Sequence, residues 1–276
     1  MLQYISPKSA NPPKILFHYT DVKGLEGIIT NQEMRATDHC FLNDKSEFDN
    51  GLKMFKKLVA NREIELSDFI KDRYDFDHDI ASVVRTIKRQ KGVYCCSFTG
   101  NGNLLSQWRG YCPKEGGYSI GFGRQALLNL TNKEYTELFC CEYREQEQFA
   151  MAKKTIEQML LRFDGSSGLS GCSNQTFHTH LKSDICFIAS AFKNCHFEEE
   201  AEWRLVSRPS RDREIYYRAD GNMLKPYITL DLPNTTIEKI IIGPCKNPQL
   251  AKQALKEFVR SKGIDPTIVI SDIPLR

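Results

Sequence analysis

Short apolar segments with strand character alternate irregularly with long helical segments, and this order constrains the fold more than any other feature of the sequence. The strand-like segments gather in residues 92–123 and 203–273, and amphipathic helical spacing dominates the stretches between them. A doubly wound parallel sheet would require regular alternation of one strand with one helix, which the sequence lacks. We therefore predict an α+β fold, with one domain over 15–276 and helical insertions near 45–91 and 142–195.

Local patterns predict the individual elements. Residues 15–20 have the pattern of a strand, and Asp21 is suited to cap the helix that follows it. The proline-containing residues 1–14 are predicted to form a flexible arm. Further strands are predicted at 92–99, 117–123, 203–208, 226–232, 237–244 and 267–273, and further helices within 41–62, 140–163, 180–194 and 249–263.

The composition points to a reduced, membrane-free environment. The chain has 276 residues, of which 41% are hydrophobic, enough for a core without covalent cross-links. Its ten cysteines are irregularly spaced, which favours free thiols over a disulfide framework. The sequence contains neither an N-terminal apolar signal region nor a run of apolar residues long enough to span a membrane. We expect a soluble cytoplasmic protein; the net charge of +3 neither requires nor excludes a nucleic-acid partner.

The acidic segment EEEAEWRLV is the most informative candidate for a functional site. On a strand, Glu200, Glu202 and Arg204 would share one face, and Trp203 and Leu205 would share the other. One interpretation is a solvated strand edge, with the apolar pair in the core. The other is a site in which crowded carboxylates alter each other's pKa values or bind cations.

Other candidate residues lie at strand ends. His18 precedes a helix N-terminus, where ligands that carry phosphate often bind, although a structural imidazole bonded to the backbone is an equally simple interpretation. Ser97 and Thr99 would place their hydroxyls on one face of a strand. Two further aromatic residues, Trp108 and Tyr111, either pack in the core or form a stacking surface.

Several other site types have weaker support in the sequence. A zinc site would have to use residues without recognised ligand spacing, namely Cys172, His178, His180, Cys186, Cys195 and His196. The basic runs 85–91 and 207–213 are either solvated faces or parts of a nucleic-acid groove. No phosphate-binding glycine loop and no serine-hydrolase elbow are present.

A set of ordered motifs between about residues 15 and 260 resembles a bacterial family known as DUF2971, a domain of unknown function. The motifs are FHYTDVKGLEGIITNQEMRATD, FLNDKSEF, SFT, LLSQWRGY, GGYSIGF, the acidic segment FEEEAEWR and IEKIIIGP. The order of the histidine-threonine strand, the Ser-x-Thr strand and the late glutamates also resembles, more loosely, the ADP-ribosyltransferase superfamily. That second resemblance implies a split β-sheet core and NAD as the substrate.

The same resemblance implies a role for each matching residue. His18 would hold the ribose next to nicotinamide, Glu202 would stabilise the positive charge of the transition state, and Glu200 would activate or orient the acceptor. Arg109 would contact the pyrophosphate. The implied catalytic residues are thus Glu202, Glu200 and His18, and the implied NAD-binding residues are His18, Tyr19, Thr20, Ser97, Thr99, Trp108, Arg109, Tyr111 and Arg204.

The expected function is therefore that of an NAD-consuming ADP-ribosyltransferase or NAD glycohydrolase without a metal cofactor. By resemblance it would be a bacterial toxin or antiphage effector, with a protein, a nucleic acid or water as the acceptor and an inhibitor or antitoxin as a partner. Two alternatives remain open: a non-catalytic module that binds nucleotides or nucleic acid, and a nuclease that uses Glu200 and Glu202 to bind Mg²⁺.

Overall fold

The computed structural model describes residues 12–42, 45–87, 93–131, 136–163, 173–208 and 214–274. The expected flexible arm at 1–14 falls mostly outside these ranges. Within them the chain forms an α+β fold, as predicted, with a 10-stranded mixed sheet. Its strands are β1 (Ile15–Thr20), β2 (Glu33–Asp38), β3 (Tyr94–Thr99), β4 (Tyr118–Gly123), β5 (Thr136–Cys140), β6 (Glu202–Ser207), β7 (Tyr216–Asp220), β8 (Met223–Asp231), β9 (Ile237–Ile242) and β10 (Thr267–Ile270).

The sheet divides at β3, which has different neighbours at its two ends. The main path runs β10-β9-β4-β1-β3-β2-β8-β7, and β6 lies on the other side of β3 and also pairs with β5. On the edge opposite β6, β1 pairs with β3 only where Phe17 faces Thr99, and β2 pairs only with Tyr94 and Cys95. The intervening part of β3 therefore has no strand partner on this edge, and an opening forms between β1 and β2.

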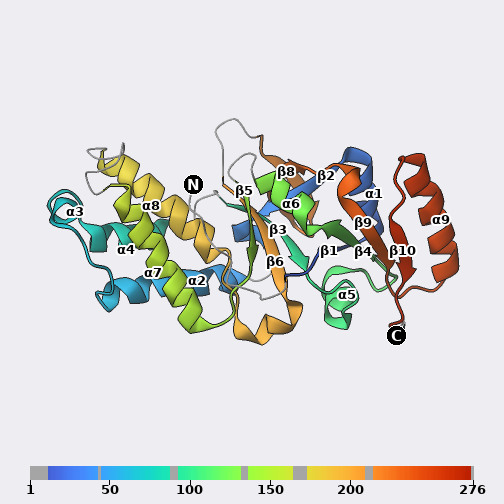
Figure 1. Cartoon of the computed structure of the whole chain (residues 1–276), viewed down its shortest axis with the longest axis horizontal. Helices are drawn as coiled ribbons and strands as arrows, with labels where there is room; N and C mark the ends of the chain where they lie inside the picture. Colours follow the sequence, from blue (N-terminus) through green and yellow to red (C-terminus); the bar gives the residue numbers. More distant parts are fainter. Residues whose placement is uncertain are drawn as a thin grey trace.

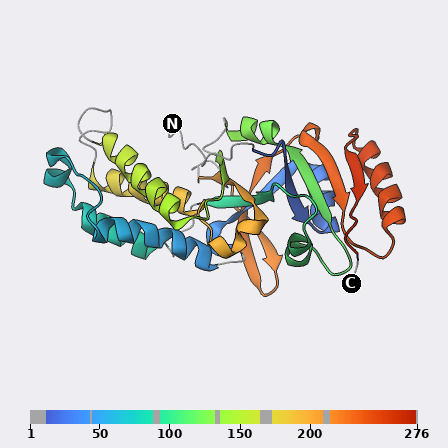
Figure 2. The same cartoon turned by 60° about the horizontal axis from the view of Figure 1, so that its bottom comes forward.

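The helices lie in two groups (Figure 1). They are α1 (Val22–Asn31), α2 (Lys45–Ala60), α3 (Asp68–Arg73), α4 (Phe76–Ile87), α5 (Leu105–Tyr111), α6 (Arg124–Thr131), α7 (Glu145–Leu161), α8 (Asn174–Ala189) and α9 (Pro248–Ser261), with short 3-10 turns η1 (His39–Phe41), η2 (Cys195–Glu200) and η3 (Asn234–Thr236). Helices α2, α3, α4, α7 and α8 gather at one end, and α1, α5, α6 and α9 lie by the sheet (Figures 1 and 2).

Helix α1 illustrates how local sequence signals set the geometry next to the opening. As predicted, the Asp21 side chain caps the helix by accepting a hydrogen bond from the Gly24 N–H at 2.6 Å. Leu25, Ile28 and Ile29 form the buried stripe of this helix and pack in the core of the sheet. The cap and the stripe together fix the direction in which the chain leaves β1.

The two expected insertions pack against each other to form a helical lobe, which we define as α2, α3, α4, α7 and α8. Its core contains fully buried side chains from both insertions, among them Phe55, Val83, Ile156 and Phe177. Tyr74 stacks on Phe177 with ring centroids 4.0 Å apart. Cys95, Phe139 and Val206 of the sheet join the same cluster, so the lobe is continuous with β3, β5 and β6.

Most strand and helix predictions are confirmed in the described residues. Strands β2, β5 and β7 and helices α5 and α6 were not predicted from the sequence. Within the described part of the chain, no helix combines the length and the apolar character that a membrane crossing requires.

Candidate functional site

The opening in the sheet orients His18 through an unusual backbone contact. In the unpaired part of β3 the Ser97 carbonyl has no strand partner on the β1 side, and it accepts a hydrogen bond from His18 Nδ1 at 2.9 Å. This contact assigns the proton of the neutral imidazole to Nδ1 and leaves Nε2 as an acceptor. Burial lowers the pKa of His18, the Ser97 carbonyl partly offsets this effect, and the charge of Arg218 lowers the pKa further. The ring is therefore neutral at pH 7.

The acidic segment approaches the same opening as a turn followed by a strand. Glu200 ends the 3-10 turn η2, Ala201 adopts a left-handed conformation with φ of 42°, and β6 begins at Glu202. The prediction that Glu200 lies on the strand is therefore wrong. Thr99 Oγ1 stabilises the turn because it donates to the Glu200 carbonyl at 2.6 Å and accepts from the Asn101 N–H at 3.1 Å.

Glu202 is a buried carboxylate held by two cations. Arg204 binds it in a bidentate contact through one guanidinium edge, with Nε to Oε1 at 2.7 Å and Nη2 to Oε2 at 2.9 Å. Lys193 also donates to Glu202 Oε2. Burial alone would raise the pKa of Glu202, but the charges and hydrogen bonds of Arg204 and Lys193 outweigh burial and lower the pKa to about 2. The interpretation of this segment as a solvated edge is wrong, since Glu202 and Arg204 are both buried, whereas the prediction that Trp203 and Leu205 lie in the core is confirmed.

Lys193 connects the two glutamates. Its ammonium donates to Glu200 Oε2 at 2.5 Å as well as to Glu202, and it lies 5.3 Å from the centroid of the Phe197 ring. Backbone bonds hold this lysine in place, because the Lys193 N–H donates to the Glu142 carbonyl and the Gln148 side chain donates to the Lys193 carbonyl at 2.8 Å. Lys193 was not predicted as a site residue, because it follows α8 without a recognisable motif.

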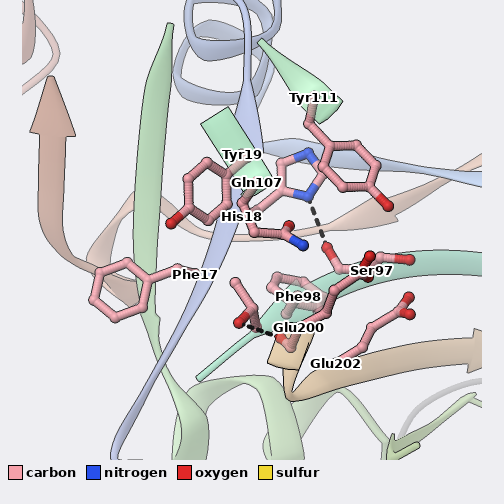
Figure 3. Close-up of a pocket in the computed structure, with 10 residues that line it drawn as sticks. Phe17, His18, Tyr19, Ser97, Phe98, Gln107, Tyr111, Glu200 and Glu202 are labelled. Carbon is pink, nitrogen blue, oxygen red and sulfur yellow. Dashed lines mark hydrogen bonds between the residues drawn. The ribbon is translucent and has the colours of Figure 1, made fainter. Parts of the chain in front are cut away.

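These groups line a pocket with a volume of about 60 Å³ at the opening of the sheet. Figure 3 shows His18 and Tyr111 on one side and Glu200 and Glu202 on the other. The lining consists of Phe17, His18, Tyr19, Ser97, Phe98, Thr99, Gln107, Tyr111, Glu200 and Glu202. The site residues expected from the first, middle and late segments of the chain thus come together.

The pocket adjoins a cleft of about 940 Å³, a volume near the upper end of the range for small-molecule sites. Six residues belong to both linings, namely His18, Tyr19, Ser97, Tyr111, Glu200 and Glu202. Thr20 and Arg204 line the cleft but not the pocket. The cleft lining also contains the cationic side chains Lys23, Arg35, Lys193, Arg218 and Lys225.

Arg218, on β7, is one of the cleft cations without a carboxylate partner among the described residues. Its Nη2 donates to Thr37 Oγ1 at 3.2 Å, and among the described residues no carboxylate lies within salt-bridge distance of it. By contrast, Lys225 pairs with Asp220 at 2.7 Å. A guanidinium without an acidic partner is suited to bind an anionic group such as a phosphate. Arg218 was not predicted as a site residue, because β7 itself was not predicted.

Two of the expected binding residues lie away from this lining. Trp108 is buried, contacts Tyr19 edge to face at 4.6 Å, and donates from its indole N–H to Asn103 Oδ1 at 2.9 Å. Arg109 is exposed on α5 and is absent from both linings, among the described residues. Tyr19 lines the pocket and also fixes the loop after β3, because its hydroxyl donates to the Asn101 carbonyl at 2.9 Å.

The comparisons with known proteins give one match. Residues 107–205 match the family model described as "Protein of unknown function (DUF2971)". The matched segment contains Gln107, Lys193, Glu200, Glu202 and Arg204. No curated protein and no solved structure matches the chain.

Proposed function

We propose that the pocket binds the nicotinamide end of NAD and breaks the bond between nicotinamide and ribose, so that the protein acts as an ADP-ribosyltransferase or an NAD glycohydrolase. The observation that carries this proposal is the meeting of His18, Glu200 and Glu202 across the divided sheet. These residues lie about 180 positions apart in the sequence, and the resemblance to ADP-ribosyltransferases links the same residue types in the same order. The division of the sheet at β3 is in keeping with the expected split core.

Loss of nicotinamide creates positive charge on the ribose ring, and a fixed carboxylate beside that ring lowers the barrier. Glu200 fits this role better than Glu202. Both Lys193 and Arg204 offset the charge of Glu202, whereas Glu200 forms an ion pair only with Lys193 among the described residues. We therefore assign Glu200 to the reacting ribose. Glu202 then acts as a positioning residue that holds Lys193. This reverses the order of importance that the resemblance implies.

His18 and Arg218 supply the remaining contacts to NAD in this proposal. The Nε2 lone pair of a neutral His18 accepts a hydrogen bond from a ribose hydroxyl, which suits the tautomer fixed by Ser97. Arg218 contacts the pyrophosphate in place of the exposed Arg109. The acceptor is water in a hydrolase, and a protein or nucleic acid in a transferase. A cytoplasmic toxin or antiphage effector, with an inhibitor or antitoxin partner, is the biological role in keeping with this chemistry.

Nicotinamide release from NAD, with and without cell lysate as a source of acceptor, tests this function. We expect release by the wild-type protein and a loss of about 100-fold or more in Glu200→Gln, because a charge-stabilising group is removed from the transition state. Glu199→Gln is the matched control, since Glu199 is exposed and lies outside both linings. Equal rates in the two variants, or no release by the wild type under either condition, would refute the enzymatic function.

One observation favours a second candidate, a module that binds a nucleotide without turning it over. Lys193 and Arg204 already compensate the carboxylates, so the pocket is well suited to stable binding. NAD binding by calorimetry without nicotinamide release would support this candidate. Contacts of the basic runs with nucleic acid belong to the same alternative, but Arg85, Lys88, Arg89 and residues 209–213 lie outside the described side chains.

The nuclease alternative fits the geometry less well. The ammonium of Lys193 bonds to both carboxylates and so takes the position between Glu200 and Glu202 that a bridging Mg²⁺ would need.

A further inference from the structure

Three adjacent side chains of ligand type meet where β2 ends, and none of them belongs to the pocket lining or the cleft lining. Strand β2 ends at Asp38, and the 3-10 turn η1 follows directly. The Asp38 carboxylate caps this turn by accepting from the Cys40 N–H at 2.9 Å. The cap bends the chain so that one ligand atom each of Asp38, His39 and Cys40 lies within 4.8 Å of the other two.

The imidazole of His39 is held in the orientation that metal-binding histidines adopt. Its Nδ1 lies 3.2 Å from the Val93 carbonyl and donates to it, so that Nε2 carries the lone pair. Nε2 accepts a hydrogen bond from the Cys40 thiol, with Sγ 3.3 Å away. A hydrogen bond from the second ring nitrogen to a backbone carbonyl is the usual way in which a protein fixes the tautomer of a metal ligand.

The spacing of the donor atoms suits a tetrahedral ion. Zinc bonds of about 2.3 Å to sulfur and about 2.0 Å to nitrogen, at a tetrahedral angle, place the two ligand atoms roughly 3.6 Å apart. The observed separation of 3.3 Å between Nε2 and Sγ is close to this value. A donor set of one thiolate, one imidazole and one carboxylate is also characteristic of zinc rather than of magnesium or calcium.

Burial distinguishes this cluster from the acidic groups found on any protein surface. Asp38 and His39 are buried, Cys40 is half-buried, and the Phe48 ring packs 4.0 Å from the imidazole. Polar groups are costly to bury unless they are paired or coordinate an ion, and here hydrogen bonds hold the three side chains close together.

We propose that Asp38, His39 and Cys40 bind one Zn²⁺ ion where β2 ends. Binding forms a zinc–sulfur bond and releases the thiol proton of Cys40 to solvent. The site is separate from NAD chemistry and contributes stability. The proposal departs from the expectation that no metal is needed. The sequence did not indicate this site, because three consecutive ligands match none of the spacings that identify zinc sites.

Metal titration of the full chain tests the site. The protein is reduced, freed of metal with a chelator, and titrated with Zn²⁺ by calorimetry and with Co²⁺ by absorption spectroscopy. We expect one ion per chain and a near-ultraviolet charge-transfer band from the cobalt–thiolate bond. Cys40→Ser removes the band, and His39→Gln weakens Zn²⁺ binding at least tenfold. The matched control Cys245→Ser, which changes another half-buried thiol, leaves both signals unchanged.

The wild-type spectrum can overturn the proposal even if the variants do not fold. A wild-type protein that binds no ion, or that binds Co²⁺ without a thiolate band, overturns the proposal. Binding that persists unchanged in folded Cys40→Ser and His39→Gln also overturns it, because the ion would then lie elsewhere. As a second readout, one equivalent of Zn²⁺ should raise the melting temperature of the wild type but not that of Cys40→Ser.

Discussion

At the scale of single residues, the contacts of Glu202 explain why an acidic segment runs into an apolar strand. Thr99 and Ser97 face Glu202 and Arg204 across the β3–β6 ladder, so the strand register brings the charged pair to the opening of the sheet. Trp203 and Leu205 point to the core of the sheet. Side chains alternate along β6, so that one face of the strand packs in the core and the other face carries the charged network.

Removal of the Glu202 charge should destabilise the fold. In Glu202→Gln, Lys193 and Arg204 stay buried but lose the anion that compensates them, and breaking such a pair costs about 3–5 kcal/mol. Chemical denaturation measures this loss in the free energy of unfolding. The control Glu199→Gln alters an exposed side chain and should change stability by less than about 0.5 kcal/mol.

The contribution of Glu202 to the free energy of unfolding should depend on pH. The folded pKa of Glu202 is lowered from 4.5 to about 2, so the unfolded chain takes up the proton first as the pH falls. The contribution of Glu202 is fully present above the unfolded value and is lost between about pH 4.5 and pH 2. The stability difference between wild type and Glu202→Gln should therefore be constant at neutral pH and shrink in this window. A difference that stays constant down to pH 2 would contradict the ion-pair assignment.

At the scale of helices and strands, close backbone packing holds the helical lobe together. Gly51 of α2 lies against Ala189 of α8, and a Cβ at position 51 would come within 2.8 Å of the Ala189 carbonyl oxygen. Neither backbone can move easily, because both helices are buried on this side. The glycine therefore sets the distance between α2 and α8.

Gly51→Ala should lower the free energy of unfolding by about 1–3 kcal/mol, because the added methyl group overpacks this contact. Gly27→Ala is the matched control, since position 27 is also helical and has no atom within 4 Å of a new Cβ. The control should raise stability slightly through its helix propensity. Thermal or chemical denaturation compares the two, and equal effects would show that the α2–α8 distance does not depend on Gly51.

Elements with a clear hydrophobic period could be predicted from the sequence, and those without one could not. Strand β1, helix α1 and helix α9 follow their patterns closely. Strand β2 has the sequence EMRATD, in which polar residues hide the buried Met34 and Ala36, and β7 is largely exposed at the sheet edge. Tertiary pairing, rather than propensity, makes these two segments strands.

The candidate site was predictable only in part for a similar reason. His18, Glu200 and Glu202 belong to motifs, so the sequence could single them out. Lys193 follows a helix without any pattern, and its role depends on a backbone bridge between Glu142 and Phe192. A contact between segments far apart in the sequence leaves no local signal.

At the scale of the whole molecule, the cleft is lined by residues that lie far apart in the sequence. Strand β1 supplies His18 near the N-terminus, and β7 supplies Arg218 in the last quarter of the sequence. The charge of Arg218 reaches His18 and lowers its pKa. In our account, NAD lies along this path, with its nicotinamide ribose in the pocket and its pyrophosphate at Arg218.

Calorimetric titration of the protein with NAD tests this arrangement most directly. We expect the wild type to bind NAD and Arg218→Gln to bind about tenfold to a hundredfold more weakly, since a charge-assisted hydrogen bond contributes about 1.5–3 kcal/mol. Arg109→Gln should bind as the wild type does, because Arg109 is exposed and outside the cleft lining. Absence of NAD binding to the wild type, or equal weakening in both arginine variants, would contradict the account.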